Sequence, residues 1–173
     1  MDQVKFIQQL INNFDIIKTE YLENESKRTI AIPGYEENST PIQEWRAVAL
    51  WWDYKPWPLY QKWFPKTTEL IRHGPSHRAS GYLILKPNSK TPLHDHKPWG
   101  NKIITHLPVI VPEGDLGFVV ENKTHRWKEG ELFAFDVTKS HYGYNNTDKD
   151  RVIFVLDFEG DGWLDALKPY MQI

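Results

Sequence analysis

Residues 102–121 read KIITHLPVIVPEGDLGFVVE. Two apolar runs within this stretch, Lys102–Val111 and Leu116–Glu121, are rich in β-branched residues, and the turn-forming group Pro112-Glu113-Gly114 separates them. A connection this short joins antiparallel strands, because a parallel pair needs a crossover of a dozen residues or more. The stretch therefore indicates antiparallel β structure.

Runs of the same kind continue on both sides of this stretch. They lie at residues 81–86, 131–137 and 151–158. Groups rich in turn-forming residues separate the runs, at residues 87–89, 128–130 and 145–147. Short strands that follow one another without intervening helices predict an antiparallel barrel or sandwich.

The first 75 residues follow a different pattern. Apolar residues recur every three or four positions over residues 2–15 behind Asp2, which predicts an amphipathic helix with Asp2 as its N-cap. A short strand is expected around residues 29–32, and a second helix over residues 65–74. Between them, the aromatic residues 45–63 predict core and lid packing.

The composition limits the classes of protein to consider. A chain of 173 residues, 40% of them hydrophobic, is long enough for one packed domain and too short for two of ordinary size. The net charge of -2 provides no global field that would favour a nucleic-acid partner. The absence of cysteine excludes disulfides and thiolate metal sites, and leaves imidazole and carboxylate as metal ligands. No run approaches the ~18 apolar residues of a membrane-spanning helix, so we expect a cytoplasmic protein without a membrane partner.

The histidines form the most informative pattern. In an extended chain, residues two apart point to the same face, so His94 and His96 can converge on one ion while Asp95 points away. Two histidines alone make a weak site, and His141, in front of a turn expected at residues 142–148, is the candidate third ligand. The alternative is that these are surface or turn histidines without a ligand.

Arg151 supplies a second indication of a site. It opens the apolar strand RVIFVLD at residues 151–157. An arginine that enters a barrel interior is costly unless an anion meets it, since a buried charge without a partner is not compensated. An arginine fixed beside a metal suggests a cosubstrate that carries a carboxylate.

Several segments follow one another in a recognisable order. They are residues 85–89, 106–112, 127–131 and 135–136, His141 with Asn145, and residues 151–157. In this order they resemble the aspartyl/asparaginyl β-hydroxylase family of Fe(II)- and 2-oxoglutarate-dependent oxygenases, and weaker similarity reaches back to residues 44–46. The resemblance implies a mainly β, double-stranded β-helix (jelly-roll) fold with N-terminal and covering helices. We therefore expect one domain over residues 1–173, with a helical or irregular cover at 1–75, the jelly-roll core at 76–160 and a C-terminal segment at 161–173.

The resemblance also implies roles for individual residues. It makes His94 the proximal and His141 the distal iron ligand, and it places Arg151 on the distal carboxylate of 2-oxoglutarate with His106 near the metal-binding end. The family often has further basic residues just before the position of His106, where this chain offers only Lys102. These three basic residues form the expected cosubstrate site.

The third iron ligand has three possible sources. The common facial triad carries a carboxylate two residues after its first histidine, and here that place is occupied by His96. The first possibility is that His96 is itself the third ligand, which gives a three-histidine site. Asp95 could replace His96 if a bulge turned it inward, and otherwise water completes the shell.

The implied function is hydroxylation of an unactivated C–H bond with Fe(II), 2-oxoglutarate and O2, which yields succinate and CO2. The substrate is a small molecule or a peptide, such as an amino acid or an Asp- or Asn-type residue. Residues expected to face the substrate are Lys97, Trp99 and Asn101. Residues that could form a wall of the mouth are Trp51, Trp52 and Tyr54. Asp136 and Asn145 are candidates to orient His141, and His73, His77 and His125 lie outside the pattern.

Two other functions fit part of the pattern. A cupin-type three-histidine metalloenzyme, such as an isomerase or a thiol-dioxygenase-like enzyme, would use the same histidines without 2-oxoglutarate. A cupin-type enzyme of this kind has no evident need for Arg151. This residue therefore distinguishes it from a 2-oxoglutarate-dependent oxygenase. A binding module that kept the barrel and lost the metal is the third class, and the retained histidines disfavour it.

Overall fold

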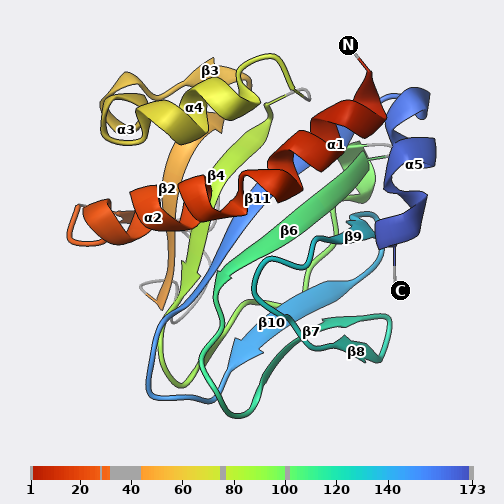
Figure 1. Ribbon diagram of the computed structural model, residues 1–173. Coiled ribbons are helices and arrows are strands. Elements are labelled where there is room, and N and C mark those ends of the chain that lie inside the picture. Colours follow the sequence, from red (N-terminus) through yellow and green to blue (C-terminus); the bar gives the residue numbers. More distant parts are fainter. Residues whose placement is uncertain (1, 28, 32–43, 75–76, 100–101, 172–173) are drawn as a thin grey trace.

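Two antiparallel sheets form the body of the protein, and helices cover the outer face of the larger one (Figure 1). The computed structural model describes residues 2–27, 29–31, 44–74, 77–99 and 102–171. The larger sheet has the order β1-β2-β4-β11-β6-β9, with β3 paired to β2, and the smaller has the order β5-β10-β7-β8. This is the predicted mainly β, jelly-roll architecture.

The strands of the larger sheet are β1 (Ile30–Ala31), β2 (Trp45–Trp52), β3 (Lys55–Pro56), β4 (Ala79–Leu85), β6 (Lys102–Ile110), β9 (Phe133–Asp136) and β11 (Arg151–Glu159). Those of the smaller sheet are β5 (Ser89–Lys90), β7 (Leu116–Val120), β8 (Lys123–His125) and β10 (His141–Asn145). The five strands predicted from apolar runs are β4, β6, β7, β9 and β11, and all five are confirmed.

The helices are α1 (Gln3–Asn12), α2 (Phe14–Asn24), α3 (Pro58–Trp63), α4 (Pro65–Ile71) and α5 (Asp161–Leu167), with short 3-10 turns η2 (Lys97–Trp99) and η3 (Lys168–Tyr170). Asp2 caps α1 as predicted, since its carboxylate accepts a hydrogen bond from the Lys5 amide at 3.2 Å. The buried Glu20 of α2 accepts bonds from the first amides of α4, Lys66 and Thr67, at 2.9 and 2.8 Å. No helix of the described residues has the length and apolar character to cross a membrane.

β11 shows how the core is divided. Its even-numbered residues, such as Phe154 and Leu156, pack in the cluster between the larger sheet and the helices. Its odd-numbered residues Ile153 and Val155 pack in the second cluster, with Phe118 of the smaller sheet. Because successive side chains point to opposite faces, the odd-numbered Arg151 is directed into the space between the sheets.

The sequence pattern did not predict β2, β3, β5, β8 or β10, of which β2 and β10 are the longest. β2 is buried along most of its length and pairs with β4, so residues 1–75, predicted as a helical or irregular cover, also contribute strands to the sheet. A strand buried on both faces shows no alternation, so the aromatic residues 45–63 indicated core and lid packing but not a strand. β10 lies where a turn was expected at residues 142–148, and it pairs with β7 and β5. His141 is thus the first residue of a strand.

Candidate metal centre and its cavity

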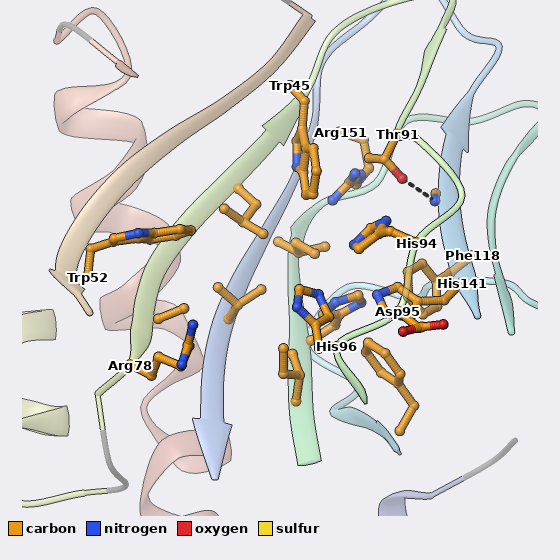
Figure 2. Close-up of a pocket in the computed structure, with 18 of the residues that line it drawn as sticks. Trp45, Trp52, Arg78, Thr91, His94, Asp95, His96, Phe118, His141 and Arg151 are labelled. Atoms are coloured by element: carbon orange, nitrogen blue, oxygen red, sulfur yellow. Dashed lines mark hydrogen bonds between the residues drawn. The ribbon is translucent and has the colours of Figure 1, made fainter. Parts of the chain in front are cut away.

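The three predicted ligands come together between the two sheets (Figure 2). His94, His96 and His141 each offer a ring nitrogen within 4.8 Å of the others. The ring centroids of His94 and His141 are 4.3 Å apart, and His96 lies 5.0 and 5.5 Å from them. A segment before β6 and the start of β10 therefore supply one cluster of three imidazoles.

The backbone holds His94 and His141 opposite each other. The His94 amide donates to the His141 carbonyl at 3.1 Å, and the His141 amide donates to the His94 carbonyl at 2.8 Å. Each Nδ1 lies 2.7 Å from a carbonyl two residues earlier, that of Pro92 or Lys139. A carbonyl can only accept, so Nδ1 carries the proton and Nε2 is the lone-pair nitrogen of each ring. Histidines that bind metals are commonly held in this way.

Electrostatics keeps the cluster neutral. Burial lowers the pKa of His94, and burial together with the neighbouring imidazoles lowers the pKa of His96 to about 3 and that of His141 to about 4. Neutral imidazole is the form that binds a metal. At neutral pH all three rings are therefore in the ligand form.

Asp95 is engaged elsewhere. Its carboxylate accepts from the Lys97 ammonium at 2.8 Å and from the Lys97 amide at 3.3 Å, and these contacts hold the pKa of Asp95 below its usual value. It does not belong to the group of ring nitrogens that could share an ion. The geometry thus favours His96 over Asp95 as the third ligand.

The cluster lines a cavity of about 710 Å³. Apolar side chains from both sheets form much of its wall, among them Leu83, Ile104, Phe118, Phe135, Ile153 and Val155. Arg151 lines the same cavity, together with His106 and Trp127. A mostly apolar cavity with a few converging polar groups is typical of a small-molecule site.

Arg151 is a buried cation in the wall of the cavity. Its side chain is 2% exposed, and among the described residues Nε and Nη1 have no hydrogen-bond partner. The guanidinium lies 4.5 Å from the Trp127 ring centroid, a cation–π contact. Burial lowers the pKa of Arg151 to about 9, so the group remains charged at neutral pH. A buried charge of this kind indicates a binding position for an anion.

Trp127 links Arg151 to His106. The indole Nε1 donates to His106 Nδ1 at 3.3 Å, which leaves the proton of the neutral ring on Nε2. Burial, with the nearby charge of Arg151, lowers the pKa of His106 well below its usual value. His106 therefore offers a neutral N–H donor close to the guanidinium, and a single tryptophan supports both groups.

The structure does not bring Lys102 to this site. Lys102 does not line the cavity, and its ammonium pairs with Glu159 and lies 3.1 Å from the Tyr54 hydroxyl. Lys97 is exposed and pairs with Asp95. The predictions for the Trp99 side chain and for Asn101 lie outside the described part of the chain.

Of the other candidate residues, some line the cavity and others pack elsewhere or are exposed. Trp52 lines the cavity, whereas Trp51 stacks on His77 with centroids 4.3 Å apart, and the exposed Tyr54 donates to Glu159 at 2.8 Å. His125 stacks on Phe133 at 3.9 Å and His73 is exposed. The histidines predicted to lie outside the pattern are indeed packed or exposed, away from the cluster.

Asp136 and Asn145 act on turns rather than on the His141 ring. Asp136 accepts from the Thr138 amide and hydroxyl at 2.9 and 2.7 Å, which shapes the turn that carries Lys139 to His141. The buried Asn145 donates to the carbonyls of Leu85, Lys86 and Lys149 at 3.1, 3.1 and 2.8 Å. Both residues therefore fix the backbone around β10.

The sequence reasoning assigned no role in the site to Trp127, Thr91 or Arg78. The Thr91 hydroxyl accepts from the Gly143 amide at 2.8 Å, which joins the segment before His94 to β10. Thr91 precedes the histidine pair in the sequence, but nothing local predicts its partner. Arg78 lines the cavity together with Trp52, and no motif marked it.

Comparisons with known proteins identify related sequences. A family model described as aspartyl/asparaginyl beta-hydroxylase matches residues 11–160. An ornithine lipid ester-linked acyl 2-hydroxylase from Rhizobium tropici is 32% identical over 96 residues, which cover 54% of this chain and 34% of that protein. The aspartyl/asparaginyl beta-hydroxylase of Homo sapiens is 23% identical over 173 residues, 97% of this chain and 22% of that protein. The chain thus spans about a third or less of the length of these relatives. A solved cupin domain, that of Schizosaccharomyces pombe Cnp3, matches 55% of this chain and 64% of its own with a TM-score of 0.40 and 13% identity.

Proposed function

The chain belongs to the aspartyl/asparaginyl β-hydroxylase family, and on this premise we propose that it is an Fe(II)- and 2-oxoglutarate-dependent dioxygenase. It hydroxylates an unactivated C–H bond of an amino acid or of an Asp- or Asn-type residue in a peptide. The observation that carries the proposal is the presence, in one cavity, of three neutral imidazoles and a buried arginine whose Nε and Nη1 have no hydrogen-bond partner among the described residues.

The donor set fits Fe(II). His94, His96 and His141 provide three imidazole nitrogens, a type of ligand that suits iron, and they leave coordination positions for two oxygens of 2-oxoglutarate and for O2. When bound, the iron would supply the centre at which O2 oxidises both 2-oxoglutarate and the substrate. One oxygen atom would enter succinate and the other the new hydroxyl group, with release of CO2. The apolar wall excludes water from the reacting carbon.

The cosubstrate would be held by Arg151 and His106. The guanidinium pairs with the carboxylate far from the metal, and the Nε2–H of His106 donates to an oxygen nearer the metal end. Both groups are buried, so their hydrogen bonds to an anion are stronger than they would be in water. Trp127 would keep both donors in place before the cosubstrate binds.

A conservative change at Trp127 tests this arrangement. Trp127→Phe keeps a ring beneath Arg151 but removes the N–H that fixes the His106 proton on Nε2. The loss of one hydrogen bond is worth about 1 kcal/mol, so we expect about a fivefold weaker affinity for 2-oxoglutarate with unchanged metal content. Isothermal titration calorimetry on anaerobic, metal-loaded protein measures it. The control is Trp163→Phe, since Trp163 packs on Phe6 and Phe158 at the helical side. Equal affinities of the two variants would contradict the role of Trp127.

Succinate formation tests the function as a whole. Protein loaded with Fe(II) without oxygen, then mixed with 2-oxoglutarate and O2, should form succinate slowly without substrate and faster when a substrate is present. Neither turnover nor binding of 2-oxoglutarate would favour the cupin-type three-histidine metalloenzyme, which the same histidine cluster also fits. Failure of Fe(II), Mn(II) or Ni(II) to raise the thermal stability would instead favour a non-catalytic binding module.

A further inference from the structure

We propose that Thr91 is a further cosubstrate-binding residue, and that its hydroxyl group donates a hydrogen bond to the carboxylate of 2-oxoglutarate that pairs with Arg151. The inference rests on the proposed function, because it adds a residue to the same site. It concerns a side chain to which the resemblance assigned no role. Three features of Thr91 support it: its place in the cavity wall, the bond that its hydroxyl oxygen accepts, and its position beside Arg151.

Thr91 lies in the wall of the cavity, directly after β5. It is 5% exposed, and it lines the same cavity as the histidine cluster and Arg151. Among the described residues of this wall, Thr91 is the one that carries a hydroxyl group. A polar group that has left water is costly unless it forms hydrogen bonds, so the partners of this hydroxyl group decide its role.

The backbone of β10 occupies the oxygen of the Thr91 hydroxyl group and leaves its hydrogen. The Gly143 amide donates to Thr91 Oγ1 at 2.8 Å, and the Thr91 amide donates to the Gly143 carbonyl, also at 2.8 Å. In a regular antiparallel pair the Gly143 amide would bond to the Thr91 carbonyl, so the hydroxyl oxygen takes the place of that carbonyl. A hydroxyl group also has one hydrogen to donate, and no described residue accepts it here. The oxygen is therefore held in place while the hydrogen remains for a ligand.

A β-bulge directs Thr91 toward the cavity. Beyond the β5–β10 ladder, His94 pairs with His141. Between the ladder and this pair the chain has three residues, 91–93, on one side and two residues, 142–143, on the other. The extra residue interrupts the regular alternation, by which side chains three positions apart point to opposite faces. Thr91 and His94 can thus both line the cavity.

Thr91 and Arg151 meet at the same glycine. The Gly143 amide bonds to the Thr91 hydroxyl, and a Cβ placed on Gly143 would lie 3.7 Å from Nη2 of Arg151, which is van der Waals contact. Figure 2 shows the Thr91 hydroxyl next to the guanidinium, on the same side of the histidine cluster. A carboxylate has two oxygens with about four lone-pair positions, so it can pair with a guanidinium and also accept from a hydroxyl group. One carboxylate of the diacid would therefore bind to both side chains.

This role differs from a purely structural one in what it does to two similar ligands. 2-Oxopentanoate has the carbon chain and the 2-oxo acid group of 2-oxoglutarate, with a methyl group in place of the second carboxylate. A hydroxyl group that donates to this carboxylate affects the binding of 2-oxoglutarate and not that of 2-oxopentanoate. A residue that only holds β10 and His141 in place would affect both ligands alike.

The experiment measures binding of both 2-oxo acids by calorimetry to the full chain loaded with Ni(II) without oxygen, so that no turnover occurs. Thr91→Val keeps the shape of the side chain without its hydroxyl group. We expect it to bind 2-oxoglutarate about tenfold or more weakly than the parent protein, with the affinity for 2-oxopentanoate and the Ni(II) content unchanged. Thr91→Ser keeps the hydroxyl group and should bind both ligands as the parent protein does.

Thr105→Val is the matched control. Thr105 is 1% exposed, and its hydroxyl group donates to the Leu156 carbonyl at 3.3 Å, outside the cavity. Its loss removes one buried hydrogen bond of a strand without touching the cosubstrate. The affinity of this variant for 2-oxoglutarate should equal that of the parent protein.

The outcomes distinguish the inference from the proposed function. If the parent protein does not bind 2-oxoglutarate, the proposed function fails, and the role of Thr91 fails with it. If the parent protein binds it and Thr91→Val binds it equally well, the inference is overturned while the function stands. Equal weakening of both ligands in Thr91→Val would also overturn it, because Thr91 would then act by holding β10 in place. If Thr91→Val does not fold, Thr91→Ala is compared in the same way, since it leaves room for a water molecule to bond to the Gly143 amide. Loss of Ni(II) from both variants would assign Thr91 a structural role instead.

Discussion

His141→Ala will fail to retain Fe(II). His141 is 3% exposed, its Nδ1–H donates to the Lys139 carbonyl, and its Nε2 keeps the lone pair that can bind the ion shared with His94 and His96. Loss of a residue that only supports a ligand typically costs 10–100-fold in metal affinity, so loss of a ligand should cost roughly 100-fold or more. The measurement is iron content by mass spectrometry after anaerobic loading and gel filtration. The same variant should lose the thermal stabilisation that Mn(II) gives the parent protein.

His73→Ala is the matched control for this experiment. His73 is exposed and lies outside the histidine cluster, so this variant should load iron as the parent does. The ladder bonds of β10 to β7 are formed by the backbone, and they should keep His141→Ala folded. Full iron occupancy and activity in His141→Ala would show that another residue is the ligand.

The strands that the sequence predicts well are those with a one-sided or continuous apolar pattern and clear turns. β6 and β7 are of this kind. The proline within β6, Pro108, is tolerated because the ladder between β6 and β11 shifts register opposite it, between Val152 and Ile153.

β10 was predicted as a turn because Gly143 and Asn145 are turn-forming residue types. In the structure Gly143 pairs with Phe118 of β7, and its amide donates to the Thr91 hydroxyl at 2.8 Å. These partners lie far from Gly143 in the sequence, so a local pattern does not show them.

In the site, too, the sequence predicts what depends on local geometry and does not predict contacts between distant segments. His94 and His96 are two residues apart, so local geometry brings them together, and the structure groups both with His141. Lys102 was predicted from its place before His106, four residues away on the same face of β6. It lies instead at the end of that strand, where the register places Glu159 opposite it and the two charges pair. Arg78 reaches the cavity through contacts with Asp53 and the neighbours of His77, none of which a motif encodes.

The guanidinium of Arg151 provides the second large effect. In Arg151→Ala we expect binding of 2-oxoglutarate to weaken by about 2–4 kcal/mol, or roughly 30- to 700-fold, because a buried, charged hydrogen-bonding partner of the diacid is removed. Metal content should stay the same, since Arg151 is not part of the histidine cluster. Calorimetric titration of 2-oxoglutarate into anaerobic, metal-loaded protein gives the affinity, and the exposed Arg72, which pairs with Glu69, supplies the control Arg72→Ala.

The burial of the Arg151 charge allows a second measurement of the same role. Nε and Nη1 lack hydrogen-bond partners among the described residues, so without a ligand the folded protein bears the cost of a buried charge. Arg151→Met replaces that charge by an apolar chain of similar length, and we expect it to raise the melting temperature of the protein without cosubstrate. Added 2-oxoglutarate should stabilise the parent protein but not this variant, as differential scanning fluorimetry would show. Unchanged affinity for 2-oxoglutarate in either Arg151 variant would show that this residue does not bind the cosubstrate. A lower melting temperature for Arg151→Met would show that the guanidinium stabilises the protein even without the cosubstrate.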